Sequence, residues 1–213
     1  MQLHFRFFVV LVFGLWTLAA AGATATTDAG NEEVFRYFQS LDSFHAHFSQ
    51  KVTGGDGTLI QDSVGEVWIR RPGRFRWNYA KPFEQQVVAD GVKLWTYDAE
   101  LQQATVKPIS EVLSTTPAML LAGSRQLADV VDVEAIGRKA GQRWYRLRPK
   151  HHDENLDEVQ LVFEQDELHS IRVHDNFNNT TVIEFTDVRR NEPVADSLFK
   201  IDLPAGTDIL GDR

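Results

Sequence analysis

Much of this chain consists of short segments in which apolar and polar residues alternate, and this pattern limits the fold more than any other feature. Phe44 and Phe48 would face one side of an extended segment, and His45 and His47 the other, as alternate positions of a strand do. Turn signals such as Pro72-Gly73 and Asp90-Gly91 separate the segments. The pattern predicts about eleven strands, over residues 44–52, 58–71, 75–79, 85–89, 92–98, 101–107, 130–137, 143–149, 156–163, 168–175 and 180–188.

So many short antiparallel strands in one small domain favour a strongly curved sheet or a barrel. Two helices are predicted beside them. Residues 31–41 carry an apolar stripe, and residues 116–123 form a short apolar helix with Pro117 at its start and Gly123 past its end. The predicted fold class is therefore mainly β (α+β). Because two short helices can fill the inside of a curved sheet only in part, we also expect an apolar pocket.

Residues 1–23 have the features of a secretory signal peptide. A weakly basic start precedes an apolar stretch over residues 7–20, and small residues follow it. We expect cleavage after Ala23, with Ala25 as the alternative, and a single domain over residues 24–213. An uncleaved membrane anchor is the other interpretation, but the apolar stretch is short for a membrane span.

The chain contains no cysteine and has a formal net charge of −8. An exported protein without cysteine folds without disulfides, and it cannot carry the N-terminal lipidated cysteine of a lipoprotein. Its acidic balance disfavours binding to nucleic acid and to anionic lipid surfaces.

Conventional catalytic and metal-binding motifs are not found. The run from His151 to Glu154 contains possible metal ligands, but adjacent residues of an extended chain point apart, and a solvated hairpin tip is the simpler interpretation. His45 and His47 lack an evident third ligand. The glycine-rich turn at residues 54–57 is not followed by the lysine and serine or threonine of a phosphate loop.

Arg71 is the most unusual polar residue. Alternation places it on the same face as Val67 and Ile69, whereas Arg70 falls on the opposite face. A cation on an apolar face needs acceptors, because an unpaired buried charge is costly. On pattern alone, an arginine stacked on aromatic rings with its guanidinium in water is favoured; the alternative is a guanidinium bound inside the domain.

The chain resembles the periplasmic outer-membrane lipoprotein carrier family, LolA. Four segments carry the resemblance: SFHAHFSQKV at residues 43–52, GEVWIRRPGRFRW at 65–77, VADGVKLWTYD at 88–98 and TPAMLLAG at 116–123. Their order and spacing make the match specific, and it is strongest between residues 43 and 123. The resemblance implies an unclosed, strongly curved antiparallel half-barrel with a small helical lid over an apolar cavity.

The resemblance also implies a function and a site. The family carries acylated lipoproteins from an inner-membrane ABC transporter to an outer-membrane receptor. Its functional arginine falls on Arg71, which would act as a lid latch by binding backbone carbonyls around Leu121, Ala122 and Gly123. We expect a monomer that needs no cofactor or metal and binds no nucleic acid. Alternation and the apolar short helix suggest the cavity lining: Phe48, Val67, Ile69, Phe75, Trp77, Val88, Leu94, Met119 and Leu120.

Two other classes remain open at this point. A hydrolase or lipid-modifying enzyme on a similar curved sheet would need convergent carboxylates, histidine or serine in the cavity. A structural binding module of the cell envelope would lack a deep cavity. No nucleophile with an adjacent base is apparent in the sequence, which favours the non-enzymatic carrier.

Overall fold

The computed structural model describes residues 25–109, 117–123, 127–150 and 156–211, without the side chains of residues 25–30, 119, 156 and 157. These residues form one twelve-stranded sheet, in the order β12-β6-β5-β4-β3-β2-β1-β11-β10-β9-β8-β7. The strands are β1 Ser43–Thr53, β2 Leu59–Arg70, β3 Arg74–Lys81, β4 Gln85–Asp90, β5 Lys93–Asp98, β6 Gln103–Pro108, β7 Val131–Lys139, β8 Gln142–Pro149, β9 Leu156–Glu164, β10 Glu167–Asp175, β11 Thr180–Arg190 and β12 Asp208–Gly211. Each of the eleven predicted strands is present, and β12 is additional.

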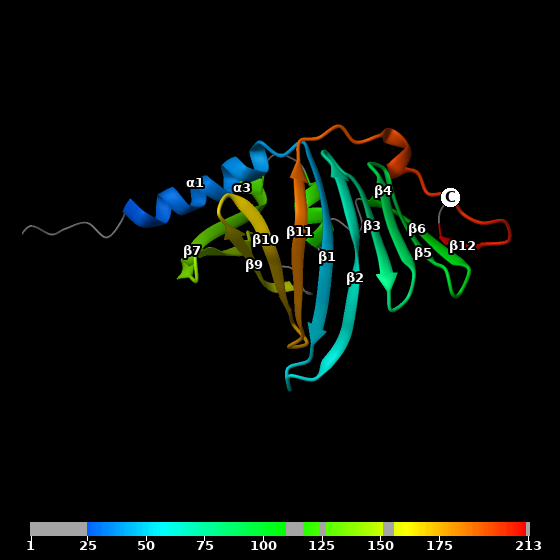
Figure 1. The fold of residues 1–213 in the computed structure, drawn as a ribbon, viewed down its shortest axis with the longest axis horizontal. Coiled ribbons are helices and arrows are strands. Elements are labelled where there is room, and N and C mark those ends of the chain that lie inside the picture. Colours follow the sequence, from blue (N-terminus) through cyan, green and yellow to red (C-terminus); the bar gives the residue numbers. More distant parts are fainter. Residues whose placement is uncertain (1–24, 110–116, 124–126, 151–155, 212–213) are drawn as a thin grey trace, which may run out of the picture.

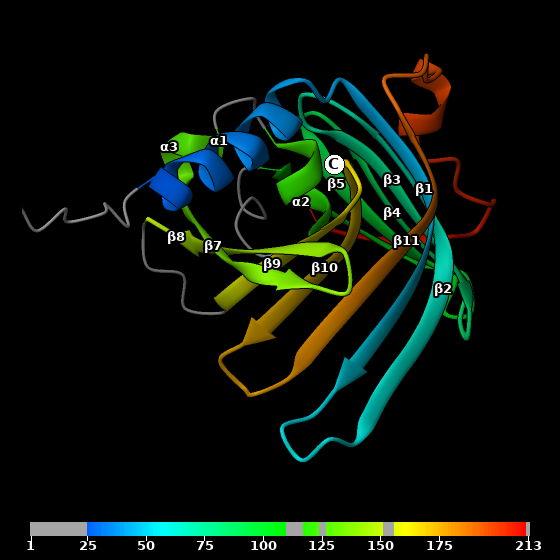
Figure 2. The ribbon, with the colours of Figure 1, turned by 60° about the vertical axis from the view of Figure 1, so that its left-hand side comes forward.

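Two antiparallel meanders make up the sheet. Strands β1 to β6 form one and β7 to β11 the other, and pairing of β1 with β11 joins them at the centre. Strand β12 pairs with β6 and is parallel to it. The sheet curls strongly, as Figure 2 shows, and its end strands β7 and β12 are not paired with each other. The predicted unclosed half-barrel is therefore confirmed.

Three α-helices lie on the concave side of the sheet (Figures 1 and 2). They are α1 Ala25–Gln39, α2 Pro117–Ala122 and α3 Leu127–Val130. Helix α1 begins earlier than the prediction of residues 31–41, and α3 was not predicted as a helix. In the described part of the chain, no helix combines the length and apolar character needed to cross a bilayer.

The core is an apolar layer between the concave face of the sheet and these helices. Alternation along β2 and β3 turns Val67, Ile69, Phe75 and Trp77 inward, and none of them is more than 3% exposed. Both meanders and both longer helices contribute to one continuous cluster of buried side chains. Burial of apolar surface is the main favourable contribution to such a fold.

The C-terminal segment packs on the opposite, convex face. Its 3-10 helix η2, Asp196–Phe199, lies against β3 and β4, with Phe199 only 2% exposed. Arg70 Nη1 donates to the Val194 carbonyl at 3.0 Å, and Arg76 Nη1 donates to the Leu198 carbonyl at 3.0 Å. Arginines that point outward from β2 and β3 thus fix a segment whose irregular sequence predicted no element.

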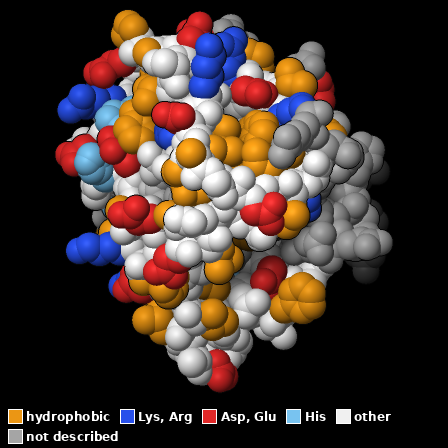
Figure 3. Space-filling model, turned by 90° about the vertical axis from the view of Figure 1, so that its right-hand side faces the viewer, with side chains coloured by type: hydrophobic (Ala, Val, Ile, Leu, Met, Phe, Trp, Pro, Cys, Tyr) orange, Lys and Arg blue, Asp and Glu red, His pale blue; other side chains and the backbone are white. Residues whose placement is uncertain are grey.

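The side of the molecule that bears β12 has a mixed surface (Figure 3). Asp and Glu side chains are spread among apolar ones over this face, and Lys and Arg lie mainly near its margins. A chain with a formal net charge of −8 and such a surface offers no broad basic field on this side to a polyanion.

Gly65 is where the backbone of β2 approaches a neighbouring ring most closely. The pairing of β2 with β3 shifts register between Val64 and Gly65. A Cβ atom at Gly65 would lie 2.0 Å from the Asn78 carbonyl oxygen and 2.7 Å from the Phe48 ring. Only glycine therefore allows the Phe48 ring and the Asn78 carbonyl to approach the backbone of β2 this closely.

We predict that Gly65→Ala destabilises the fold by about 1–3 kcal/mol or more, because a methyl group would overpack a backbone contact that cannot move freely. Urea unfolding measures the effect as a lower midpoint. The control is Val64→Ala at the neighbouring position, which is 40% exposed and should cost less than about 1 kcal/mol. Equal midpoints for Gly65→Ala and wild type would show that the ring and the carbonyl relax without cost.

Candidate functional site

Arg71 joins the ends of two helices. It follows β2 and is 8% exposed. Its Nε donates to the Gly123 carbonyl just beyond α2 at 2.7 Å, and its Nη1 donates to the Phe38 carbonyl near the end of α1. Its backbone N–H donates to the Asp42 carbonyl at 2.9 Å. One guanidinium therefore holds both helices against the end of a strand.

Helix ends supply suitable acceptors for this cation. The last carbonyls of a helix have no partner within the helix and carry negative partial charge, so a guanidinium satisfies both the hydrogen bonding and the dipole. Gly73 reinforces the contact, because its N–H donates to the Ala122 carbonyl at 2.7 Å. The Arg71 guanidinium also makes a cation–π contact with the Phe38 ring, whose centroid lies 5.9 Å from the guanidinium carbon.

The three predicted latch partners have different roles in the structure. Gly123 accepts from the Arg71 side chain, whereas Ala122 accepts from the backbone of the turn. Leu121 contributes a side chain that is fully buried in the core. The Phe38 carbonyl was missed. A signal for it existed, because Phe38 lies in the last turn of the predicted first helix, where carbonyls lack helical partners.

Arg70 points the other way, as alternation predicted. It binds the C-terminal segment on the convex face, through the Val194 carbonyl and the Asp196 carboxylate. Its guanidinium carbon also lies 5.2 Å from the centre of the Phe199 ring. The two adjacent arginines therefore serve opposite faces of the sheet.

Most of the predicted cavity residues meet in the apolar layer under the helices. Phe48, Val67, Ile69, Phe75 and Trp77 belong to the buried cluster. Leu94 and Leu120 are partly buried and pack against that cluster. The side chain of Met119 lies outside the described residues.

The prediction for Val88 was wrong. Val88 pairs with Arg76, which faces outward, whereas its neighbours Val87 and Ala89 pair with the inward-facing Trp77 and Phe75. Val87 and Ala89 therefore face the helices, and Val88 lies on the convex side. The run Val87-Val88-Ala89 is apolar throughout, so alternation could not decide which residues face inward.

An aromatic group lies on the concave face of β1, β3 and β11. The Phe48 ring lies 4.7 Å from the Trp77 ring and 5.3 Å from the Tyr79 ring, measured between centroids. Phe185 of β11 adds a fourth ring, 6.4 Å from Trp77. Tyr79 shares the face of Trp77 on β3 by alternation but was not among the predicted lining residues. Phe185 was not predicted, because its place beside Trp77 depends on how separate strands pair. The group gives this part of the layer a broad apolar surface.

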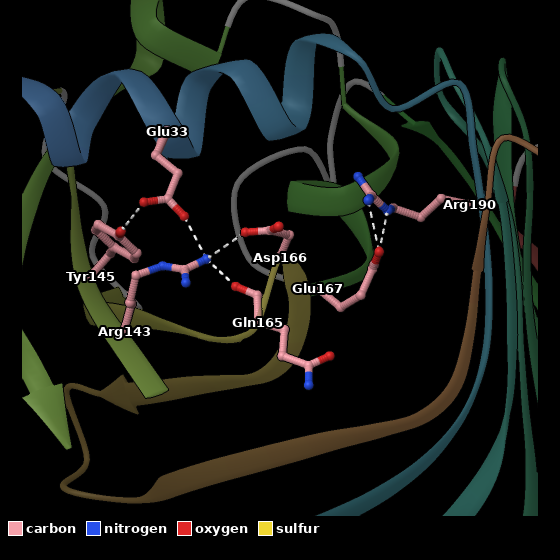
Figure 4. A network of polar contacts seen from close by, with 7 residues as sticks. All are labelled: Glu33, Arg143, Tyr145, Gln165, Asp166, Glu167 and Arg190. Carbon is pink, nitrogen blue, oxygen red and sulfur yellow. Dashed lines mark hydrogen bonds and ion pairs between the residues drawn. The ribbon is translucent and has the colours of Figure 1, made fainter. Parts of the chain in front are cut away.

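A second polar network attaches α1 to the other meander (Figure 4). Glu33 of α1 accepts from Arg143 Nη2 at 2.6 Å and from the Tyr145 hydroxyl at 2.6 Å. Arg143 also contacts the Gln165 carbonyl and the Asp166 carboxylate in the turn between β9 and β10. Helix α1 is thus fixed to β8 as well as to Arg71.

The Tyr145 hydroxyl keeps the proton that it donates to the Glu33 carboxylate. Burial, together with the hydrogen bond to the Glu33 carboxylate, raises the pKa of Tyr145 to about 12. The phenol therefore stays protonated at neutral pH and remains the donor.

A further contact of α1 involves Arg190. Its Nη2 donates to Glu167 at 2.7 Å, and its guanidinium carbon lies 4.7 Å from the centroid of the Tyr37 ring of α1.

The histidines on β1 face outward. His45 Nε2 lies 2.6 Å from Glu66 Oε1, and the His45 ring stacks on Trp68 with centroids 5.2 Å apart. Among the described residues, no three His, Asp or Glu side chains are grouped as ligands for a metal ion. The run from His151 to Glu154 lies outside the described residues.

We predict that Glu33→Ala loosens α1. The buried Tyr145 hydroxyl loses its acceptor, which costs about 1–3 kcal/mol, and Arg143 loses a partly buried ion pair. Amide hydrogen exchange along α1 should accelerate, and the urea midpoint should fall. Glu32→Ala is the matched control, because Glu32 is exposed on the same helix. Equal rates of amide hydrogen exchange along α1 in the two variants would show that the network does not hold α1.

Sequence comparison places the chain among known proteins. The sequence model of the outer membrane lipoprotein carrier protein LolA matches residues 39–202. The outer-membrane lipoprotein carrier protein of Methylobacillus flagellatus is 37% identical over 96% of both chains. That of Methylococcus capsulatus is 33% identical over 98% of this chain and 99% of its own.

Comparison with solved structures agrees on the fold. An uncharacterized conserved protein from Thermus thermophilus superposes with a TM-score of 0.54 at 13% identity, over 85% of this chain and 98% of its own. The match of the family model over most of the chain, together with the near full-length relatives, shows that the chain belongs to the outer membrane lipoprotein carrier protein family, LolA.

Proposed function

We propose that this protein is a periplasmic carrier of acylated lipoproteins. It takes them from an inner-membrane ABC transporter, shields their acyl chains in the apolar layer under its helices, and delivers them to an outer-membrane receptor. The observation that carries this proposal is the Arg71 contact, because one side chain closes two helices over an apolar surface through a few hydrogen bonds. The names of the relatives support the cargo class.

The energetics of acyl chains explain why such a carrier is needed. Each CH₂ group removed from water contributes about 0.8 kcal/mol, so a free lipoprotein would aggregate or enter the first membrane it met. A carrier must therefore offer apolar surface to the chains and still give them up. The role consists of binding and release and requires no catalytic group.

The Arg71 latch would supply the release. In the closed form, the guanidinium satisfies the carbonyls of Phe38 and Gly123. Acyl chains that enter the layer must displace the helices and break these hydrogen bonds. Loading is then less favourable than in a permanently open site, and the difference in affinity favours transfer to the receptor.

Export completes the proposal. Residues 1–23 act as a leader that is removed after Ala23 or Ala25, and residues 24–213 form the single carrier domain. The mature chain contains no cysteine for lipid attachment, so it would move freely in the periplasm as a monomer.

We expect the protein purified from periplasm to bring a triacylated polypeptide with it. Mass analysis after denaturation would show a species that bears three acyl chains on its N-terminal cysteine. Repeated purification with no acylated polypeptide, from cells that make lipoproteins, would contradict the carrier proposal. Release of free fatty acid or an altered lipid from added lipoprotein would instead indicate an enzyme.

We expect Arg71→Leu to load at least as well as wild type and to transfer poorly. The substitution removes charge-assisted hydrogen bonds from the closed form only, and each is worth about 1.5–3 kcal/mol. That energy corresponds to a shift of about tenfold or more in the balance between loaded and empty protein. The measurement is the fraction of lipoprotein passed to the receptor in a fixed time.

Arg189→Leu is the matched control for Arg71→Leu. It removes the same charge from an exposed position on β11 and should leave transfer unchanged. Equal loading and equal transfer by wild type and Arg71→Leu would refute the latch and leave the carrier proposal intact.

A further inference from the structure

The indole N–H of Trp77 is a buried donor with no acceptor among the residues that the structure describes. Trp77 is 3% exposed, and its Nε1 has no hydrogen-bond partner in the described part of the chain. Its neighbours are apolar: the Phe48 ring at 4.7 Å, the Phe185 ring at 6.4 Å, and Val67 and Val87 on the adjoining strands. Tyr79 also lies beside Phe48, and its hydroxyl already donates to Gln50 Oε1 at 3.2 Å.

Such a donor is unfavourable unless another state supplies an acceptor. An indole nitrogen only donates, and leaving a buried donor unpaired costs free energy, whereas a phenylalanine ring in its place would leave nothing unpaired. The closed protein provides no carbonyl or carboxylate for it among the described residues. Since none of the residues that the structure describes provides an acceptor, a guest that enters the apolar layer is a natural source of one.

A guest with acyl chains offers acceptors in one place only. Hydrocarbon tails carry none, so the carbonyl at the head of each chain is the sole polar group that enters with it. In an N-terminal S-diacylglyceryl cysteine, the two ester carbonyls lie farther from the peptide than the amide carbonyl. They would therefore be the first to reach a donor buried under the helices.

We propose that, in the loaded carrier, the Nε1–H of Trp77 donates a hydrogen bond to an ester carbonyl of the guest lipid. The inference rests on the proposed function and adds a polar contact to a site otherwise built of apolar surface. A few placed polar groups typically fix the orientation of a ligand in an apolar site. Trp77 thus sets the depth at which the head of an acyl chain stops, and it selects acyl esters over plain hydrocarbon.

The test compares two lipopeptides that differ only at the esters. One bears ester-linked chains on its glyceryl group, the other has both esters replaced by ethers, and both keep the N-acyl amide. Equal amounts compete for the full mature protein, and mass spectrometry of the intact complexes gives the ratio bound. We expect wild type to favour the ester form about threefold to tenfold, the effect of one net hydrogen bond.

Trp77→Phe should bind both forms within about twofold of each other, because the ring remains and the donor is gone. Trp68→Phe is the matched control on the outer face, where Trp68 stacks on His45, and it should keep the wild-type ratio. Each ratio is taken within one variant, so a general loss of stability or affinity does not affect it.

A second measurement needs no variant. With ¹⁵N-labelled tryptophan, the indole N–H resonance of Trp77 should move downfield with the ester lipopeptide and less with the ether form. Equal binding of the two forms by wild type, or an unchanged preference in Trp77→Phe, would overturn the inference. Failure of wild type to bind either lipopeptide would overturn the carrier proposal, and the inference with it.

Discussion

The structure depends most on the hydrogen bonds that a buried cation, Arg71, donates to the ends of helices. Arg71 is satisfied by main-chain carbonyls from two different helices. Charge-assisted bonds to helix ends are strong enough to hold the helices. A six-residue helix such as α2 is marginal on its own, so its place over the sheet depends on this contact and on packing.

The two helices above the apolar layer are attached unequally. Helix α1 is held near its C-terminal end by Arg71 and at Glu33 by Arg143 and Tyr145. Helix α2 is held at its end by Arg71 and Gly73. Loss of the Arg71 contact would leave the end of α2 with the Gly73 hydrogen bond, whereas Glu33 would still tie α1 to β8. In the proposed carrier, α2 would therefore move more readily than α1.

Sequence patterns predicted the structure correctly where one hydrophobic periodicity determines the element or the direction of a side chain. They placed eleven strands, the short apolar helix, and Arg70 and Arg71 on opposite faces. The patterns failed where the same local sequence is compatible with two side-chain directions or with two ways of packing the elements. Val88 lies in an apolar run with no polar residue to mark its outer side, and the Phe38 carbonyl depends on how α1 meets β2. Strand β12 forms only because the chain returns to pair in parallel with β6, a long-range contact that a four-residue segment cannot signal.

The open sheet has a consequence for the size of its guest. In a closed barrel, strand number and shear fix the circumference and hence the interior. Here β7 and β12 end the sheet without meeting, so its curvature can change while every strand pair stays intact. In the proposed carrier, such a sheet would form a trough whose width can vary. It would then take up acyl chains of different length and saturation with the same side chains, and without breaking a ladder of hydrogen bonds.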